Sequence, residues 1–92
     1  MTNVISHFNS MHYFYILYSE KVNRYYYGSS KNPEIRIKLH NQGATKSTKS
    51  GMPWELIYTE CYLTKTEALR REKEIKKIRK RSYIENLINQ KP

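Results

Sequence analysis

The segment YFYILYSEKVNRYYYGS, residues 13–29, decides the fold of this chain. Residues 13–18 form an unbroken run of aromatic and aliphatic side chains, which is typical of a strand buried on both faces. Residues 20–24 are polar and predict a turn, and residues 25–29 return as a second run rich in tyrosine. The pattern predicts a β-hairpin in which successive side chains point to opposite faces.

The segment after the hairpin carries the signals of a helix start and a helix end. Asn32 suits the N-cap, and Pro33 suits the first helical position, where the missing N–H of proline does no harm. Gly43 suits the left-handed residue that closes a helix. We expect Ile35 and Leu39, one turn apart on this helix, to pack on the sheet.

The second half of the chain predicts a loop, one strand and two helices. Residues 43–53 lack periodicity and predict a loop, and residues 54–62 predict a third strand. A capping-box pattern at residues 64–67 opens a long helix that we expect to reach about residue 80, and residues 83–88 predict a short terminal helix. The order β-β-α-β-α-α predicts an α+β fold with a small three-stranded antiparallel sheet flanked by helices.

The composition excludes several classes of protein and favours an acidic polymer as partner. The 92 residues include 17 Lys or Arg against 8 acidic residues, which gives a formal net charge of +9. All acidic residues are Glu, so a site that bridges two metal ions with clustered carboxylates is disfavoured. Any metal chemistry is expected to use one carboxylate together with phosphate oxygens and waters, which suits Mg²⁺.

The single cysteine and the sequence near the chain ends allow further predictions about disulfides, domain bounds and location. Cys61 excludes an intrachain disulfide and a zinc finger, and we expect it to be a small core residue. Residues 1–11 are predicted to be a disordered extension, and residues 12–90 the folded domain. No apolar stretch is long enough for a membrane helix and no signal peptide is evident, so the chain is expected to be soluble and cytoplasmic.

Arg36 and His40 lie four residues apart and project from one face of the predicted first helix, beside the apolar seam. Arginine can stabilise charge on a phosphate, and histidine can transfer protons. The alternative is structural: a partly solvated arginine, and a histidine that interacts with the negative end of the helix dipole. Periodicity alone leaves both interpretations open.

Glu72 is unusual because it falls within the apolar stripe of the long helix, between Ala68 and Ile75. A carboxylate there costs free energy unless it is paired, hydrogen-bonded or bound to a metal ion. Arg71 or Lys76 could neutralise it, so a structural role stays open beside a metal-binding one. Glu72 is nevertheless the candidate metal ligand of this chain.

Two further groups of residues suit contact with nucleic acid. Tyrosine can hold or deprotonate a nucleophilic water, but its pKa near 10 requires nearby positive charge to lower it. The Thr-, Ser- and Lys-rich loop and the cationic run after Glu72 suit contacts with backbone phosphates, although solvated charged surfaces are the alternative. The candidate nucleic-acid-binding residues are Lys46, Thr48, Lys49, Lys73, Lys76, Lys77 and Lys80.

Taken together, these residues resemble the GIY-YIG nuclease superfamily, and most closely its small, single-domain bacterial group. The matching pieces, in chain order, are Tyr13-Phe14-Tyr15, Tyr26-Tyr27-Gly28, Arg36 with His40, Pro53-Trp54-Glu55-Leu56, and Ala68-Leu69 with Glu72. The likeness extends from Tyr13 to about Ile88 and identifies residues 12–90 as a nuclease domain. Tyr13 and Phe14 depart from the Gly and Ile of the family motif, and the role of Asn86 stays open.

The resemblance implies an active site of Tyr15, Tyr26, Arg36, His40 and Glu72. It implies Tyr15 as general base, Arg36 on the scissile phosphate, and Glu72 as ligand of one divalent cation, Mg²⁺ or Mn²⁺. Tyr26 and His40 would position water or relay the proton.

The implied activity is DNA endonuclease, with little intrinsic sequence specificity and a role in repair or recombination. DNA is the expected partner, with branched or nicked duplexes among the candidate substrates, and a protein partner could direct the enzyme to them. The alternative is a module of the same fold that binds nucleic acid without cleaving it, or that cleaves only when a partner activates it.

Overall fold

The computed structural model describes residues 11–90, so nearly all of the expected N-terminal extension, residues 1–10, lies outside the described residues. The elements are β1 (His12–Ser19), β2 (Arg24–Ser30), α2 (Pro33–Asn41), the 3₁₀ helix η1 (Lys46–Gly51), β3 (Glu55–Tyr62), α3 (Lys65–Lys77) and α4 (Arg81–Asn89). The predicted α+β fold and its element order are confirmed. Among residues 11–90, no helix has the length and hydropathy needed to cross a membrane.

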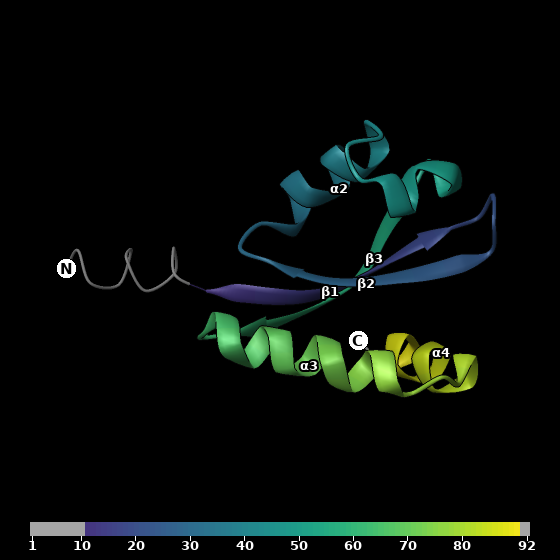
Figure 1. The fold of residues 1–92 in the computed structure, drawn as a ribbon. Coiled ribbons are helices and arrows are strands. Elements are labelled where there is room, and N and C mark those ends of the chain that lie inside the picture. The colour runs from purple at the N-terminus through teal and green to yellow at the C-terminus, as the bar shows by residue number, and fades with distance from the viewer. Residues whose placement is uncertain (1–10, 91–92) are drawn as a thin grey trace.

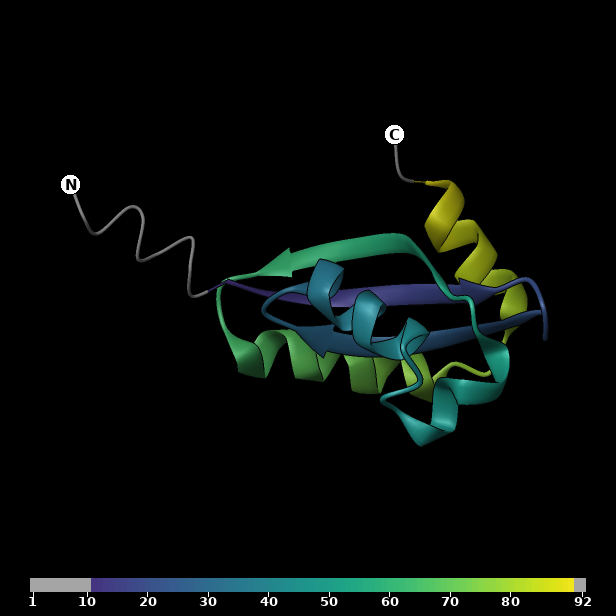
Figure 2. The same ribbon diagram turned by 90° about the horizontal axis from the view of Figure 1, so that it is seen from above.

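The sheet has three antiparallel strands in the order β2-β1-β3, so β1 lies in the centre. Helix α2 and η1 cover one face, and α3 and α4 cover the other (Figures 1 and 2). Because β1 is covered on both sides, Phe14, Tyr15, Ile16 and Leu17 are almost fully buried, as the apolar run predicts. The central strand therefore carries side chains to both faces of the domain.

The alternation of side chains along the hairpin divides the core in two. Phe14 and Ile16 pack with Ile75 of α3 and Ile84 of α4 on one face. Tyr15 and Leu17 pack with Trp54 on the α2 face, and Tyr26 of β2 lies against this second cluster. Tyr15 and Tyr26 consequently share the α2 face of the sheet.

Helix α2 begins and ends as predicted, but it packs through a different side. The Asn32 side chain accepts a hydrogen bond from the N–H of Ile35, and Gly43 beyond the helix has a φ of 78°. The expected contact of Ile35 and Leu39 with the sheet is wrong, because these side chains are 54% and 36% exposed. Ile37 packs on the core instead, since apolar residues two apart define no single helical stripe.

Three smaller expectations also need correction. The predicted loop contains η1, and α3 ends at Lys77 rather than near residue 80. The chain turns there and returns as α4, which places Ile84 in the core, although neither Gly nor Pro marks the break. Cys61 is exposed rather than buried, because it lies near the end of an edge strand, with its Sγ 3.1 Å from Sδ of Met11.

Candidate active site

The ring of Tyr15 crosses directly over Gly28, its partner on the neighbouring strand. A Cβ atom at residue 28 would lie 2.5 Å from the Tyr15 hydroxyl oxygen and 2.6 Å from Cζ, closer than real Cβ contacts. Glycine is therefore required here for space rather than for a special backbone angle. The pairing of a tyrosine in the first motif with a glycine in the second thus has a direct steric cause.

His40 of α2 contacts the Tyr15 hydroxyl from above the sheet. Its Nε2 lies 3.4 Å from the Tyr15 oxygen, its Nδ1 lies 2.8 Å from Oγ1 of Thr48, and the side chain is fully buried. The ring also meets the edge of the Tyr26 ring, with centroids 4.9 Å apart. Burial, and to a lesser degree the charge of Arg36, lower the pKa of His40 below its ordinary 6.5, so the imidazole is neutral at neutral pH.

Arg36 lies one helical turn before His40 and directs its guanidinium toward Tyr15. Burial raises the pKa of the Tyr15 hydroxyl, and the neighbouring Arg36 opposes this shift without reversing it. The Nε of Arg36 is buried and has no hydrogen-bond partner among residues 11–90. A buried N–H of a cation is costly without an acceptor, so an anionic group at this position would stabilise it.

Glu72 lies on α3, on the face of the sheet opposite to α2, and its hydrogen bonds are to residues other than the four site residues on the α2 face. One carboxylate oxygen accepts a hydrogen bond from Oγ of Ser29 on edge strand β2 at 2.8 Å, and the other accepts one from Lys76 Nζ at 2.6 Å. The charge of Glu72 contributes to the raised pKa of Tyr15, so the two groups lie within electrostatic range. Glu72 therefore does pair with Lys76, as the structural interpretation allowed.

The other expected partner, Arg71, is engaged elsewhere. Its Nε donates to Glu60 of β3 at 2.9 Å, and Glu60 also accepts from the hydroxyls of Tyr58 and Tyr62. Burial alone would raise the pKa of Glu60, but the hydrogen bonds from Arg71 and the two tyrosines outweigh it and lower that pKa. This network fastens α3 to β3 and leaves Glu72 to face the β2 edge.

The donor groups around Glu72 suit one hard divalent cation held largely by water. Among residues 11–90, no three His, Cys, Asp or Glu side chains gather into a metal cluster. The Glu72 carboxylate offers hard oxygens, its side chain keeps 17% of its surface exposed, and the Ser29 hydroxyl holds one of those oxygens in place. These residues fit Mg²⁺, which commonly takes one or two carboxylates and completes its shell with waters and substrate phosphates.

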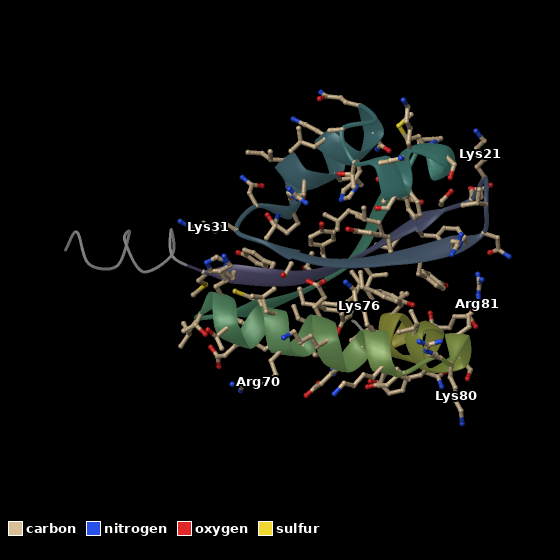
Figure 3. The ribbon with its side chains drawn as sticks, viewed as in Figure 1. Lys21, Lys31, Arg70, Lys76, Lys80 and Arg81 are labelled. Atoms are coloured by element: carbon tan, nitrogen blue, oxygen red, sulfur yellow. The ribbon has the colours of Figure 1, made fainter. Side chains whose placement is uncertain are left out.

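The expected nucleic-acid-binding residues divide into exposed lysines and one buried threonine. The exposed members are Lys46, Lys49, Lys73, Lys76, Lys77 and Lys80. In Figure 3, Lys80 points away from the sheet, whereas Lys76 lies close to it, where it pairs with Glu72. The expectation for Thr48 needs correction, because it is only 1% exposed and its hydroxyl lies between His40 and the Thr45 carbonyl.

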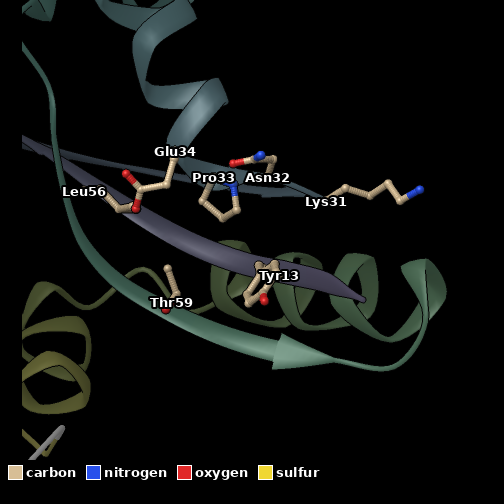
Figure 4. A pocket seen from close by; sticks show the side chains of 7 residues that line it. All are labelled: Tyr13, Lys31, Asn32, Pro33, Glu34, Leu56 and Thr59. Carbon is tan, nitrogen blue, oxygen red and sulfur yellow. The ribbon is translucent and has the colours of Figure 1, made fainter. Parts of the chain in front are cut away.

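One hollow of the described structure lies apart from the residues of the candidate site. It has a volume of about 350 Å³ and lies between the start of α2 and strands β1 and β3 (Figure 4). Its lining residues are Tyr13, Lys31, Asn32, Pro33, Glu34, Leu56 and Thr59. None of the five residues expected in the active site lines it.

Sequence reasoning missed Ser29, and it named Thr48 as a nucleic-acid contact rather than as a partner of His40. Ser29 had a usable signal, because alternation along β2 places it on the same face as Tyr25 and Tyr27, toward α3. The contact of Thr48 with His40 had none, because it depends on the path of an irregular segment.

Comparison with known proteins gives consistent results. The family described as GIY-YIG catalytic domain matches residues 11–86. A UPF0213 protein of Bacillus licheniformis is 41% identical over 78 residues, which cover 80% of this chain and 79% of that protein. The UPF0213 protein YazA of Bacillus subtilis is 39% identical over 84 residues, which cover 87% of this chain and 84% of that protein. The solution structure of a UPF0213 protein of Bacillus halodurans aligns with a TM-score of 0.56 at 34% identity, covering 88% of this chain and 85% of that one.

Proposed function

The chain belongs to the GIY-YIG catalytic-domain family, and from this premise we propose that it is a divalent-metal-dependent DNA endonuclease with little intrinsic sequence specificity. Residues 12–90 would form the nuclease domain, with Tyr15, Tyr26, Arg36, His40 and Glu72 as its active site. The resemblance expected from the sequence is confirmed at the level of the family, and a nuclease fold with nucleic acid as ligand follows from it. The reaction and the roles of the residues are our proposal.

The unpaired Nε of Arg36 carries this proposal. It is a buried donor on a permanent cation, beside the Tyr15 hydroxyl and one turn from His40. A phosphodiester oxygen would satisfy it with a charge-assisted hydrogen bond. Arg36 would therefore hold the scissile phosphate against Tyr15, in a basic protein of net charge +9 that attracts a polyanion.

Tyr15 and His40 are arranged to take a proton from an attacking water. Burial raises the pKa of Tyr15, so the phenol carries its proton at neutral pH and is a poor base alone. Neutral His40, with Nε2 3.4 Å from the Tyr15 oxygen, can accept that proton. Tyr15 would thus accept a proton from water while it passes its own to His40. Tyr26, against the His40 ring, would hold the imidazole and the water in place.

Glu72 would hold the divalent cation, Mg²⁺ or Mn²⁺, with Ser29 orienting one carboxylate oxygen. When bound, the cation would polarise the phosphoryl group and stabilise charge on the leaving oxygen. Lys76 currently donates to the other carboxylate oxygen and is half-exposed, so its ammonium can turn toward solvent or toward a DNA phosphate. Glu72 would then have one oxygen available for the cation.

A second candidate function follows from the same Lys76 contact. With Glu72 neutralised by Lys76, the fold could bind nucleic acid without cleaving it, or cleave only when a partner releases Glu72. Either way the partner polymer would be DNA, branched or nicked duplex included, and in bacteria the place of action would be the cytoplasm. Repair and recombination are the processes that use such cleavage.

The proposal is tested by incubating the full chain with supercoiled plasmid, labelled branched duplexes and a matching RNA, in Mg²⁺, Mn²⁺ or chelator. We expect DNA cleavage with either metal ion and none with chelator. Tyr15→Phe should lower the rate by roughly 10²-fold or more, with folding and DNA affinity unchanged. Tyr18→Phe is the matched control, because Tyr18 lies on the same strand and its hydroxyl donates to Asn23 at 2.7 Å rather than to a residue of the candidate site.

Binding without cleavage in either metal ion would favour the second candidate function. Equal rates for Tyr15→Phe and Tyr18→Phe would contradict the role given to Tyr15.

A further inference from the structure

The buried hydroxyl of Thr48 lies between the His40 ring and the backbone carbonyl of Thr45. Its Oγ1 lies 2.8 Å from Nδ1 of His40 and 3.2 Å from the backbone carbonyl oxygen of Thr45. The residue is 1% exposed, so no bulk water competes for these contacts. The hydroxyl has one proton to donate and can accept a hydrogen bond at the same time.

The Thr45 carbonyl favours one direction of these hydrogen bonds. A carbonyl oxygen can only accept, so Thr48 satisfies both contacts when its hydroxyl donates to Thr45. Its oxygen must then accept from an N–H at Nδ1 of His40. In a neutral imidazole that leaves Nε2 without a proton, and its lone pair faces the Tyr15 hydroxyl.

Arg36, on the other side of the Tyr15 hydroxyl, favours the same direction of hydrogen bonding. Arg36 can only donate hydrogen bonds, and it lies beside the Tyr15 hydroxyl, whose pKa it lowers against the larger effect of burial. The Tyr15 oxygen thus faces a donor, and its own proton is left for Nε2 of His40. With Arg36 as a donor at one end and the Thr45 carbonyl as an acceptor at the other, the protons of Tyr15, His40 and Thr48 all point toward Thr45.

Several hydrogen bonds hold the backbone around Thr48 in place. Its carbonyl oxygen accepts a hydrogen bond from Nε1 of Trp54 at 2.7 Å, and its N–H donates to Thr45 at 3.2 Å. Ser19 of β1 donates to the carbonyl of Gly51 at the end of η1. Thr48 is therefore held in position against His40 by Trp54 and by the backbone of η1.

We propose that Thr48 is a positioning residue that holds His40 in the Nδ1–H tautomer and so keeps Nε2 free to receive the proton of Tyr15. The consequence for catalysis rests on the proposed nuclease function. The tautomer itself is a property of the folded protein and can be measured without DNA or metal ion.

The test is nitrogen NMR of the full chain with ¹⁵N-labelled histidine, at a pH where His40 is neutral. The resonance of His40 is identified by its loss in His40→Asn. In the wild type we expect a protonated Nδ1 and an unprotonated Nε2. Thr48→Ser keeps the hydroxyl and should keep this pattern, whereas Thr48→Val removes it and should shift the ring toward the Nε2–H form. Cleavage by Thr48→Val should fall roughly 10- to 100-fold, the usual loss when a group that orients a functional histidine is removed.

A protonated Nε2 in the wild type would overturn the proposal, and this measurement needs no variant of Thr48. An unchanged Nδ1–H tautomer in folded Thr48→Val would overturn it as well. If the protein cleaves no DNA at all, the nuclease proposal fails while the tautomer measurement still decides the role of Thr48.

Discussion

Replacing Gly28 by alanine should disable the site without removing any of its functional groups. The added Cβ would lie 2.5 Å from the Tyr15 hydroxyl oxygen, 2.6 Å from Cζ and 3.1 Å from Cε1. Carbon atoms in favourable contact are about 3.5–4.0 Å apart, so the buried ring must move by about 1 Å. The contact of the Tyr15 oxygen with His40 is 3.4 Å long, and a shift of that size either breaks it or causes a clash.

Two magnitudes follow for Gly28→Ala. Overpacking in a well-packed region lowers the free energy of unfolding by about 1–3 kcal/mol. A misplacement of about 1 Å at reacting groups commonly lowers the rate about 10²-fold. We therefore expect a folded protein that melts at a lower temperature, binds DNA nearly normally and nicks plasmid about 10²-fold more slowly.

The control is Gly43→Ala, where the alanine must take a positive φ of 78° but meets no atom closer than 3.7 Å. The left-handed backbone should cost about 1–2 kcal/mol in stability, with plasmid nicking close to the wild-type rate. Melting temperature, DNA affinity and nicking rate are measured on the same preparations. Nicking by folded Gly28→Ala at the rate of Gly43→Ala would refute the steric account of the motif.

Three further predictions concern protonation, packing and charge. The pKa of His40 is lowered below 6.5, so the unfolded chain binds this proton more readily, and the free energy of unfolding should fall as pH drops from about 7 to 5. A pH series of urea denaturation should show a weaker fall in His40→Asn, and identical slopes would contradict the prediction. Glu60→Ala removes the carboxylate that pairs with the mostly buried Arg71, which then keeps only the exposed Glu74, and it should cost roughly 1–3 kcal/mol. The nicking rate of the folded fraction should stay unchanged, and denaturation and nicking assays check both. Lys46→Ala with Lys49→Ala should weaken binding to all DNA sequences alike and reduce its salt dependence, whereas a loss confined to one sequence in fluorescence titrations would contradict phosphate contact.

Much of the fold could be predicted because its strongest signals are local. The buried strand β1, the tyrosine-rich return strand, the Asn32–Pro33 helix start and the glycine after α2 each follow from residues close together in the sequence. The sequence could not predict which side of α2 packs on the sheet, because Ile35, Ile37 and Leu39 place apolar groups on several sides of the helix. The end of α3 could not be predicted either, because no helix-breaking residue marks it. It follows instead from the burial of Ile84 in the core.

The order of motifs along the sequence predicted which residues belong to the candidate site, but it did not predict how they are arranged. Periodicity left Arg36 between a solvated and a functional role, and only the fold shows that its Nε is buried without a partner among the residues that the structure describes. The requirement for Gly28 depends on strand register, which pairs it with Tyr15. Lys76 and Arg71 both stood near Glu72 in sequence, and packing assigns Lys76 to Glu72 and Arg71 to Glu60.

The most direct test of the nuclease proposal is Mg²⁺-dependent nicking of supercoiled plasmid by Glu72→Gln, with melting temperature and DNA affinity measured on the same preparation. Glutamine keeps an oxygen for the Ser29 hydroxyl but removes the charge that would hold a cation, and the half-exposed Lys76 can return to water, so stability should change by less than about 1 kcal/mol. The matched control is Glu74→Gln, because Glu74 lies on the same helix, is exposed and pairs with Arg71 at 3.1 Å rather than with a residue of the candidate site. We predict a folded Glu72→Gln protein that binds DNA and does not nick it in Mg²⁺ or Mn²⁺, beside a Glu74→Gln protein of wild-type activity. A folded Glu72→Gln protein that nicks plasmid at the wild-type rate would contradict the proposal.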